Sequence, residues 1–172
     1  ESAFARWQNK HPLYNLRLSN LSAAIIRPQL AEVPRRVRGG RANHDYMAER
    51  LNTSPFLHVP PKLAKEDRAP DSIQFNLVGL SDDEARTFAE AAAAHGVKVQ
   101  IFGQSTDNAR AFWNWQFIPG PAQELPRTRA MLMQACDCRL PARLTRDELD
   151  FIANALLDAA QDAAGALRAY GT

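Results

Sequence analysis

Few residues of this chain have the types and spacing that catalysis or metal binding requires. Cys136 and Cys138 are separated by one residue, and no second cysteine or histidine pair lies near them in the sequence. Two ligands do not complete a zinc site, so we interpret the pair as small apolar structural residues. The histidines are scattered without an H-E-x-x-H pair, which favours surface or packing roles. They are His11, His44, His58 and His95.

Arginines are concentrated in one segment, and this concentration could bind phosphate. Five of them fall within fifteen residues, and Glu32 is the only acid among them. They are Arg27, Arg35, Arg36, Arg38 and Arg41. Such a run can form a phosphate-binding stripe. More often it is the solvated face of a helix or part of a charged contact between subunits, so both interpretations stay open.

Residues 19–51 are predicted to be helical, because apolar residues recur there at spacings of three and four. Pro28 and Pro34 interrupt the pattern. A proline inside a helix removes a backbone donor and costs about 3 kcal/mol. We therefore expect a kink or two separate helices, with Gly39 and Gly40 marking another weak point.

The middle of the chain has the pattern of an α/β layer. An alternating strand is predicted at residues 73–80, and Ser81 and Glu84 then form a capping box that begins a helix. Gly96 is placed to end this helix, and a second alternating strand follows at residues 97–101. If both strands share a sheet, a right-handed crossover is the natural connection.

Shorter signals complete the predicted elements. A short strand is predicted at residues 56–59, and a helix begins at Pro126 and stops before Cys136. A second capping box, at residues 145–148, begins a last helix that runs nearly to the end of the chain. The loop between residues 103 and 126 is aromatic, which indicates either packing against another surface or a pocket lining, with packing the commoner case.

The composition is that of an ordinary globular domain. Of the 172 residues, 45% are hydrophobic and 23% are charged, and the net charge is +2, which favours a folded chain over a disordered one. No apolar run approaches the roughly 20 residues that span a bilayer, and the first ten residues do not resemble a signal peptide. Two cysteines do not make a disulfide framework, so a cytoplasmic location is expected.

One segment has a more specific pattern. Residues 14–30 read Tyr-Asn-Leu-Arg-Leu-Ser-Asn-Leu-Ser-Ala-Ala-Ile-Ile-Arg-Pro-Gln-Leu. They resemble the segment of the DegT/DnrJ/EryC1/StrS (sugar aminotransferase) family that reads Gly-Tyr-Asn-x-Arg, then Ala-Ala, then Gln-Leu on a long helix. Gly-Val at residues 96–97 and Leu-Pro at residues 140–141 follow in the order found in that family. Here Leu13 replaces the glycine of the motif.

The resemblance implies an α/β fold, the C-terminal small domain of a fold-type-I transferase that depends on pyridoxal 5'-phosphate (PLP). In such a domain a long N-terminal helix, here kinked, leads into a small sheet covered by helices. Residues 1–52 would form the N-terminal segment and the interdomain helix, and residues 53–172 the small domain.

The same resemblance implies cofactor-binding residues. In this family the Asn and Arg of the first motif reach across a homodimer toward the cofactor phosphate and substrate region of the neighbouring subunit. Asn15 and Arg17 hold these positions in the sequence. An amide can donate to a phosphate oxygen and a guanidinium can fork onto an anion. From the residues alone, Asn15 could instead cap the chain before the helix and Arg17 could pair with an acid.

A catalytic lysine is not expected in this chain. Transamination needs a lysine that holds the cofactor as a Schiff base. In the family this lysine precedes the Tyr-Asn-x-Arg motif, so it is expected upstream of Glu1 in a longer protein. The lysines present lack the context of the family's lysine, and we expect no Schiff base from this chain alone. They are Lys10, Lys62, Lys65 and Lys98.

The implied activity is transfer of an amino group from an amino acid donor to a keto-sugar or a related ketone. The implied partners are these small molecules and a second copy of the protein in a homodimer, whereas neither a membrane nor nucleic acid is expected. Three alternatives remain: a non-catalytic member of the same family, a module that binds nucleic acid through its arginine run, and a purely structural subunit.

Overall fold

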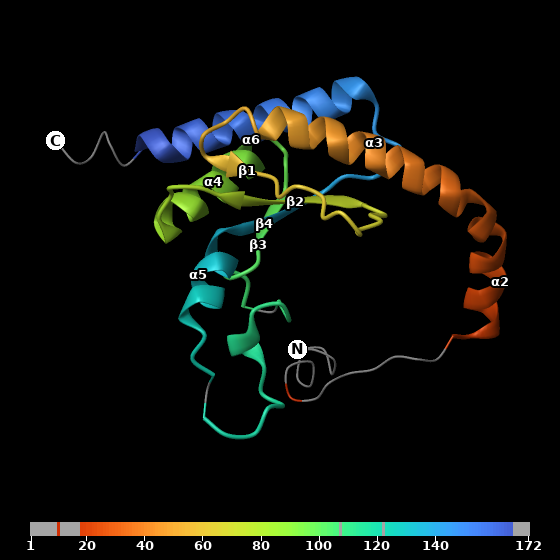
Figure 1. Ribbon diagram of the computed structural model, residues 1–172, viewed down its shortest axis with the longest axis horizontal. Coiled ribbons are helices and arrows are strands. Elements are labelled where there is room, and N and C mark those ends of the chain that lie inside the picture. Colours follow the sequence, from red (N-terminus) through yellow and green to blue (C-terminus); the bar gives the residue numbers. More distant parts are fainter. Residues whose placement is uncertain (1–9, 11–17, 107, 122, 167–172) are drawn as a thin grey trace.

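The computed structural model describes residues 10, 18–106, 108–121 and 123–166. Three helical elements come first and a small sheet with its covering helices follows (Figure 1). The elements in chain order are α2 (Asn20–Gln29), η1 (Leu30–Glu32), α3 (Val33–Leu51), β1 (Leu57–His58), β2 (Ser72–Leu77), α4 (Asp82–Ala94), β3 (Val99–Ile101), η2 (Phe112–Asn114), α5 (Pro126–Gln134), β4 (Ala135–Arg139) and α6 (Arg146–Ala166).

The four described strands form one sheet in the order β1-β2-β4-β3, and each neighbouring pair is antiparallel. Both β2 and β3 are antiparallel to β4, so they are parallel to each other and α4 crosses between them. The expectation that these two strands share a sheet is confirmed. The strand between them was not predicted, because residues 135–139 contain a short Cys-x-Cys pattern that was interpreted only as a structural pair.

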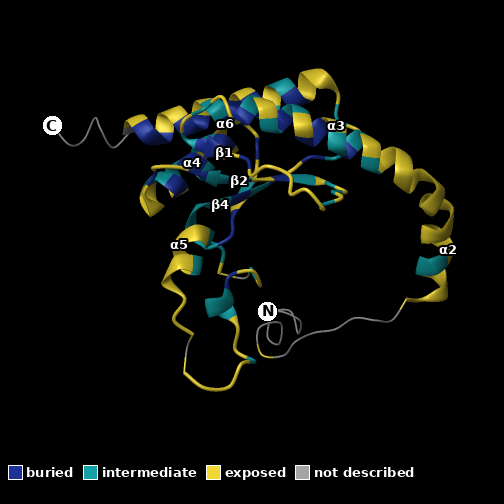
Figure 2. Cartoon of the chain, viewed as in Figure 1, coloured by how far each residue is buried: buried dark blue, intermediate teal, exposed yellow. Residues whose placement is uncertain are grey.

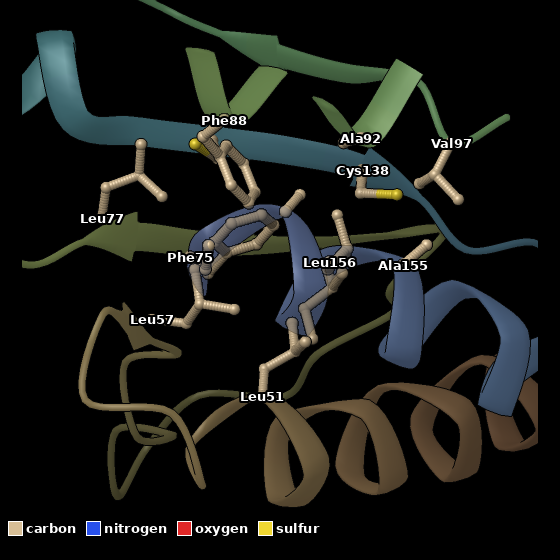
Figure 3. Close-up of a cluster of buried hydrophobic side chains, with 14 of the residues drawn as sticks. Leu51, Leu57, Phe75, Leu77, Phe88, Ala92, Val97, Cys138, Ala155 and Leu156 are labelled. Carbon is tan, nitrogen blue, oxygen red and sulfur yellow. The ribbon is translucent and has the colours of Figure 1, made fainter. Parts of the chain in front are cut away.

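Helices cover one face of this sheet. Figure 1 shows α3 and α6 side by side along it, and α4 packs extensively against α6. Alternation along the strands turns Ile73, Phe75 and Leu77 into the core together with both cysteines of β4. Figure 3 shows Phe75 and Phe88 within this core; their rings meet edge to face with centroids 6.0 Å apart. This geometry is favourable for paired aromatic rings.

The predicted break in the N-terminal helical region is confirmed at residues 30–32, which form one 3-10 turn between α2 and α3. Pro34 lies in the first turn of α3, where its missing N–H costs little. The other expected weak point, Gly39 and Gly40, is not a break, since α3 runs straight through it. The physical reason is close packing: a Cβ on Gly40 would lie 2.3 Å from the backbone oxygen of Pro70.

The two halves of this helical region differ in burial. None of the residues of α2 is buried, and Figure 2 shows the helix as mostly exposed. Its exposed apolar side chains include Leu21 and Ile25. Near the other end, Met47 and Leu51 of α3 are fully buried in the same core as β2 and α6. The proposed division of the chain at residue 52 stays a prediction.

Both predicted capping boxes are present. The Ser81 hydroxyl accepts from the Glu84 amide at 3.3 Å while the Glu84 carboxylate accepts from the Ser81 amide at 2.7 Å. Thr145 and Glu148 make the same reciprocal pair at 3.3 and 2.7 Å. Gly96 follows α4 with a positive φ of 82°, which glycine adopts without the steric cost of a Cβ. These local signals therefore predicted helix ends correctly.

The aromatic loop mainly packs on itself and on α5. Phe112 and Trp113 meet edge to face at 5.1 Å, and Trp115 stacks on Phe117 at 5.6 Å. Arg129 of α5 lies over the Trp113 ring at 4.3 Å. The packing interpretation of this loop is therefore favoured. Within the described part of the chain, no helix is long and apolar enough to cross a membrane.

Replacing Gly40 by alanine tests the close packing of α3. We expect Gly40→Ala to lower the free energy of unfolding by about 1–3 kcal/mol, because the new methyl group must displace backbone at Pro70. Gly165→Ala is the matched control, since its Cβ meets nothing within 4 Å in α6. That change should stabilise by about 0.5–1 kcal/mol. Urea unfolding measures both, and a neutral effect at residue 40 would contradict the packing.

Candidate functional site

The open face of the sheet, opposite the covering helices, carries a row of polar side chains. Gln74 of β2 and Gln100 of β3 are both in register with Asp137 of β4. Directly paired residues present their side chains on the same face. Ile73 and Cys138, which are next to Gln74 and Asp137 along their strands, are buried in the core. Gln74, Asp137 and Gln100 therefore lie on the other face. The row therefore runs across three neighbouring strands.

A cavity of about 1380 Å³ lies over this row and extends past the edge strand β3 to the start of α6. Within it, Oδ1 of Asp137 accepts from Ser72 Oγ at 2.8 Å and from Gln74 Nε2 at 3.4 Å. These two bonds fix the carboxylate on the sheet. Carboxylate, amide and hydroxyl groups together can accept from and donate to a ligand that carries several hydroxyl groups.

Several charged groups at the rim of this cavity already have partners of their own. Arg139 donates to Asp71 at 2.8 Å, and Arg110 lies over the Phe102 ring at 4.3 Å. Glu148 accepts the capping bonds of Thr145, first the backbone amide and then the hydroxyl, and these bonds lower the pKa of its carboxyl group. The row on the sheet thus keeps hydrogen-bonding capacity to offer a ligand.

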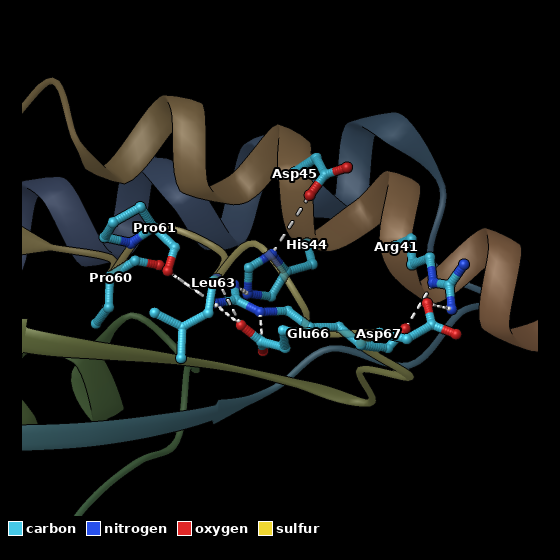
Figure 4. Close-up of polar contacts among 9 residues, drawn as sticks. Arg41, His44, Asp45, Pro60, Pro61, Leu63, Glu66 and Asp67 are labelled. Carbon is cyan, nitrogen blue, oxygen red and sulfur yellow. Dashed lines mark hydrogen bonds and ion pairs between the residues drawn. The ribbon is translucent and has the colours of Figure 1, made fainter.

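A second polar cluster fastens residues 60–68 against α3 (Figure 4). Arg41 donates to the backbone oxygen of Arg68 at 2.6 Å and to Asp67 at 2.5 Å. Arg68 binds the Glu66 carboxylate and the backbone oxygen of Pro61. The hydrogen bonds from Arg68 lower the pKa of Glu66, so its carboxylate stays charged. Two arginines therefore hold this segment in place.

His44 lies under that segment and is buried. Its Nε2 is 3.4 Å from Arg68 Nη1, and its Nδ1 is 3.6 Å from Asp45 Oδ1. Burial lowers the pKa of His44, and the positive charge of Arg68 lowers it further. The neutral ring can accept from Arg68 while its Nδ1–H faces Asp45. Surface or packing roles are predicted for the histidines: His44 is buried, His58 and His95 are exposed, and His11 lies outside the described residues.

The two cysteines are structural, as predicted. Both are buried, and burial raises the pKa of the Cys136 thiol and raises the pKa of Cys138 to about 11. Thiols with such pKa values are poor nucleophiles and poor metal ligands. Among the described residues no group of three or more histidine, cysteine or acidic side chains could hold a metal ion.

The predicted cofactor-binding residues, Asn15 and Arg17, lie outside the described residues. The lysines are all exposed, and Lys98 is the one that reaches the rim of the cavity. A lysine that forms a Schiff base is activated by desolvation or by a neighbouring cation, and exposed lysines lack the first condition. The described residues by themselves therefore do not fit a lysine-bound PLP.

Sequence reasoning missed the polar row because it missed β4. The signal was present in residues 135–139, where Cys136 and Cys138 alternate with Asp137 as buried and open positions of a strand do. A run of five residues next to a helical pattern is too short for that alternation to distinguish a strand from the end of the helix. The register with β2 and β3, which creates the row, has no local signal.

The fold matches part of several solved PLP-dependent enzymes. The sugar aminotransferase Spr1654 from Streptococcus pneumoniae, in its PMP form, superposes with a TM-score of 0.74 at 15% identity over 92% of this chain and 39% of that chain. The aminotransferase TlmJ from Streptoalloteichus hindustanus gives 0.66 at 17% identity over 90% and 40%. E. coli GDP-4-keto-6-deoxy-D-mannose-3-dehydratase with bound hydrated PLP gives 0.62 at 18% identity over 85% and 37%.

The chain thus has the small-domain fold of a fold-type-I PLP-dependent transferase and spans about two-fifths of the length of these relatives. No curated protein matched it. The family is defined by sequence: the pattern of the DegT/DnrJ/EryC1/StrS aminotransferase family matches residues 1–157. The chain belongs to this family, which confirms the resemblance seen in residues 14–30. PLP is the cofactor of the family, and solved relatives include PLP and PMP forms.

His44 should make stability depend on pH in a defined window. Its pKa in the folded state lies below 6.5, so the unfolded chain binds more protons as pH falls from 7 to 5. The free energy of unfolding should therefore decrease over this interval, and His44→Gln should flatten the slope. His58→Gln, at an exposed position, is the control. Urea unfolding at several pH values measures the slope, and an unchanged slope in His44→Gln would contradict the assignment.

Proposed function

We propose that this chain is the C-terminal portion of a PLP-dependent aminotransferase that transfers an amino group from an amino acid donor to a keto-sugar or a related ketone. The observation that carries the proposal is the family match over residues 1–157. The fold shared with solved aminotransferases over most of this chain, the sugar aminotransferase Spr1654 among them, supports it. When bound, PLP supplies the electron sink for amino transfer. The catalytic lysine belongs to another part of the protein.

In this proposal Asn15 and Arg17 hold the anionic end of the cofactor or substrate in a neighbouring subunit of a homodimer. The Asn15 amide donates to a phosphate oxygen, and the Arg17 guanidinium can donate two parallel hydrogen bonds to one anion. Both residues precede α2, the exposed helix that extends from the core through α3. The helix α2 itself has no buried residue, which suits a helix that packs against another subunit.

The polar row of Gln74, Asp137 and Gln100 is the described feature whose chemistry suits a hydroxylated acceptor. Its amides and carboxylate can hydrogen-bond sugar hydroxyl groups. The cavity above it is large enough for a sugar. We propose that the row contributes to binding and orienting the acceptor. We assign proton transfer to residues of the longer protein outside this chain.

Substituting the two motif residues tests the cofactor assignment. In the full-length protein, Asn15→Ala and Arg17→Leu should each weaken PLP retention about tenfold or more, since a hydrogen bond to a charged group contributes about 1.5–3 kcal/mol. Arg27→Leu, a solvent-exposed arginine of α2, is the control. Equilibrium dialysis against free PLP measures retention. Unchanged retention in both variants would leave these residues a structural role only.

The chain alone should not react with PLP as the full-length enzyme does. Mixed with PLP, the 172-residue chain should show no stable visible absorbance of a lysine-bound cofactor and no turnover of keto-sugars, whereas the full-length protein shows both. Product analysis should distinguish amino transfer from dehydration, because one solved relative is a dehydratase. A stable visible band from the chain alone that is lost in Lys98→Ala would contradict the assignment of the lysine to another segment.

A further inference from the structure

A strap of polar residues lies across the buried ring of His44. The strap consists of residues 60–68, between β1 and β2, and Figure 4 shows it against α3. None of its side chains is buried, and its leucine, Leu63, is 72% exposed. Because the strap contributes no side chain to the core, polar contacts hold it in place. Segments held in this way open at a lower free energy than the core does.

Three polar contacts between described residues join the strap to α3. Arg41 donates to Asp67 at 2.5 Å and to the backbone oxygen of Arg68 at 2.6 Å. The third contact joins Arg68 Nη1 to Nε2 of His44 at 3.4 Å. A neutral ring can accept this bond, whereas a protonated ring carries a hydrogen on Nε2 and a positive charge that faces the guanidinium. When His44 takes up a proton, one of the three contacts is therefore replaced by a repulsion.

The charges that act on His44 come from the strap and from α3. Arg68 opposes a second positive charge, whereas Asp45 and Glu66 favour one. Asp45 is exposed and therefore screened by water and salt, and Glu66 is already bonded to Arg68. Burial of the ring and the charge of Arg68 outweigh both acids, so the pKa of His44 lies below its ordinary value. The neutral ring is thus the form that fits beneath the strap.

A cavity of about 420 Å³ lies between the strap, His44 and one edge of β2. Ser72 and Gln74 line it from β2 and carry no charge, and Asp71, which also lines it, is paired with Arg139 at 2.8 Å. The strand β1 pairs with the last two residues of β2 and does not reach Ser72 or Gln74. The strap therefore lies beside a part of the strand edge that β1 leaves unpaired.

We propose that the strap is a pH-dependent device: protonation of His44 breaks its bond with Arg68, and the strap is released from α3 and from the edge of β2. Once the ring is exposed to solvent, its pKa returns to the ordinary value of 6.5, whereas beneath the strap its pKa is lower. The released state therefore binds the proton more tightly. Its population rises as pH falls below 6.5, by at most about tenfold per pH unit.

Release of the strap affects two neighbouring features. The edge of β2 at Ser72 and Gln74 becomes more accessible, and an open strand edge can pair with another chain. Gln74 also lines the larger cavity over the polar row, so the same movement reaches the proposed acceptor site. This second effect rests on the proposed function, whereas the release itself is independent of it.

Limited proteolysis of the full-length protein with thermolysin tests the release. Thermolysin cleaves before large apolar residues, and Leu63 is the exposed leucine of the strap. A synthetic peptide of residues 59–70 corrects for the pH dependence of the protease itself. The cleavage rate at Leu63 relative to the peptide should rise about fivefold from pH 7.5 to pH 5.5. At both pH values it should exceed cleavage within α4 and α6 at least about tenfold, because these helices open only when the core does.

Three variants, each checked for folding by a melting curve, connect the release with His44. In His44→Gln the side chain can still accept from Arg68 but takes up no proton, so the rise should disappear. His58→Gln, at an exposed position, should keep the rise. Arg68→Gln removes both the tie and the opposing charge, so the strap should be cleaved faster at pH 7.5 and with less dependence on pH. An equal rise in His44→Gln, no rise in the wild type, or cleavage of α4 and α6 as fast as that at Leu63 would overturn the proposal.

Discussion

The architecture depends on the pairing of β4 on both of its edges. This strand is antiparallel to β2 along five residue pairs and to β3 along three, so it joins two strands that otherwise make no ladder contact. Its buried face contributes Cys136 and Cys138 to the core beneath α4 and α6, and its open face contributes Asp137 to the cavity. This strand of five residues therefore connects β2 with β3, completes the core and supplies the central residue of the polar row.

Local signals were sufficient for most of the elements, and long-range contacts decided the rest. The Ser81 and Thr145 capping boxes, the alternation in residues 73–77 and Gly96 each act within a few residues, and each predicted its element. The central position of β4 depends on partners more than thirty residues away. Gly39 and Gly40 illustrate the same limit. Two adjacent glycines predict a weak point in a helix, whereas here they allow the backbone of Pro70 and Ala142 to approach α3 closely.

The candidate functional residues also fall into two groups, those predicted from the sequence and those found only in the structure. The family motif predicts Asn15 and Arg17 as cofactor-binding residues without any structure, because a motif carries information about subunits and cofactors that one chain does not contain. The polar row is the opposite case, since its members are brought together from distant segments. No local sequence feature connects Gln74, Asp137 and Gln100; only the register of β2, β4 and β3 does so. Family recognition and physical packing therefore supplied different residues.

The helix α2 has no buried residue and continues into α3 through the 3-10 turn, so a small rotation at the turn moves its far end. A ten-residue helix without a buried face is too short to be stable alone, so its order is propagated through the 3-10 turn from the anchored end of α3. From residue 32 back to residue 20, this arm extends about 20 Å at 1.5 Å per residue. A rotation of about 10° at the turn displaces its tip by roughly 3 Å, and misplacement by about 1 Å can cost a hundredfold in rate. Under the proposed function, core residues such as Met47 therefore help to position a site at the far end of α2.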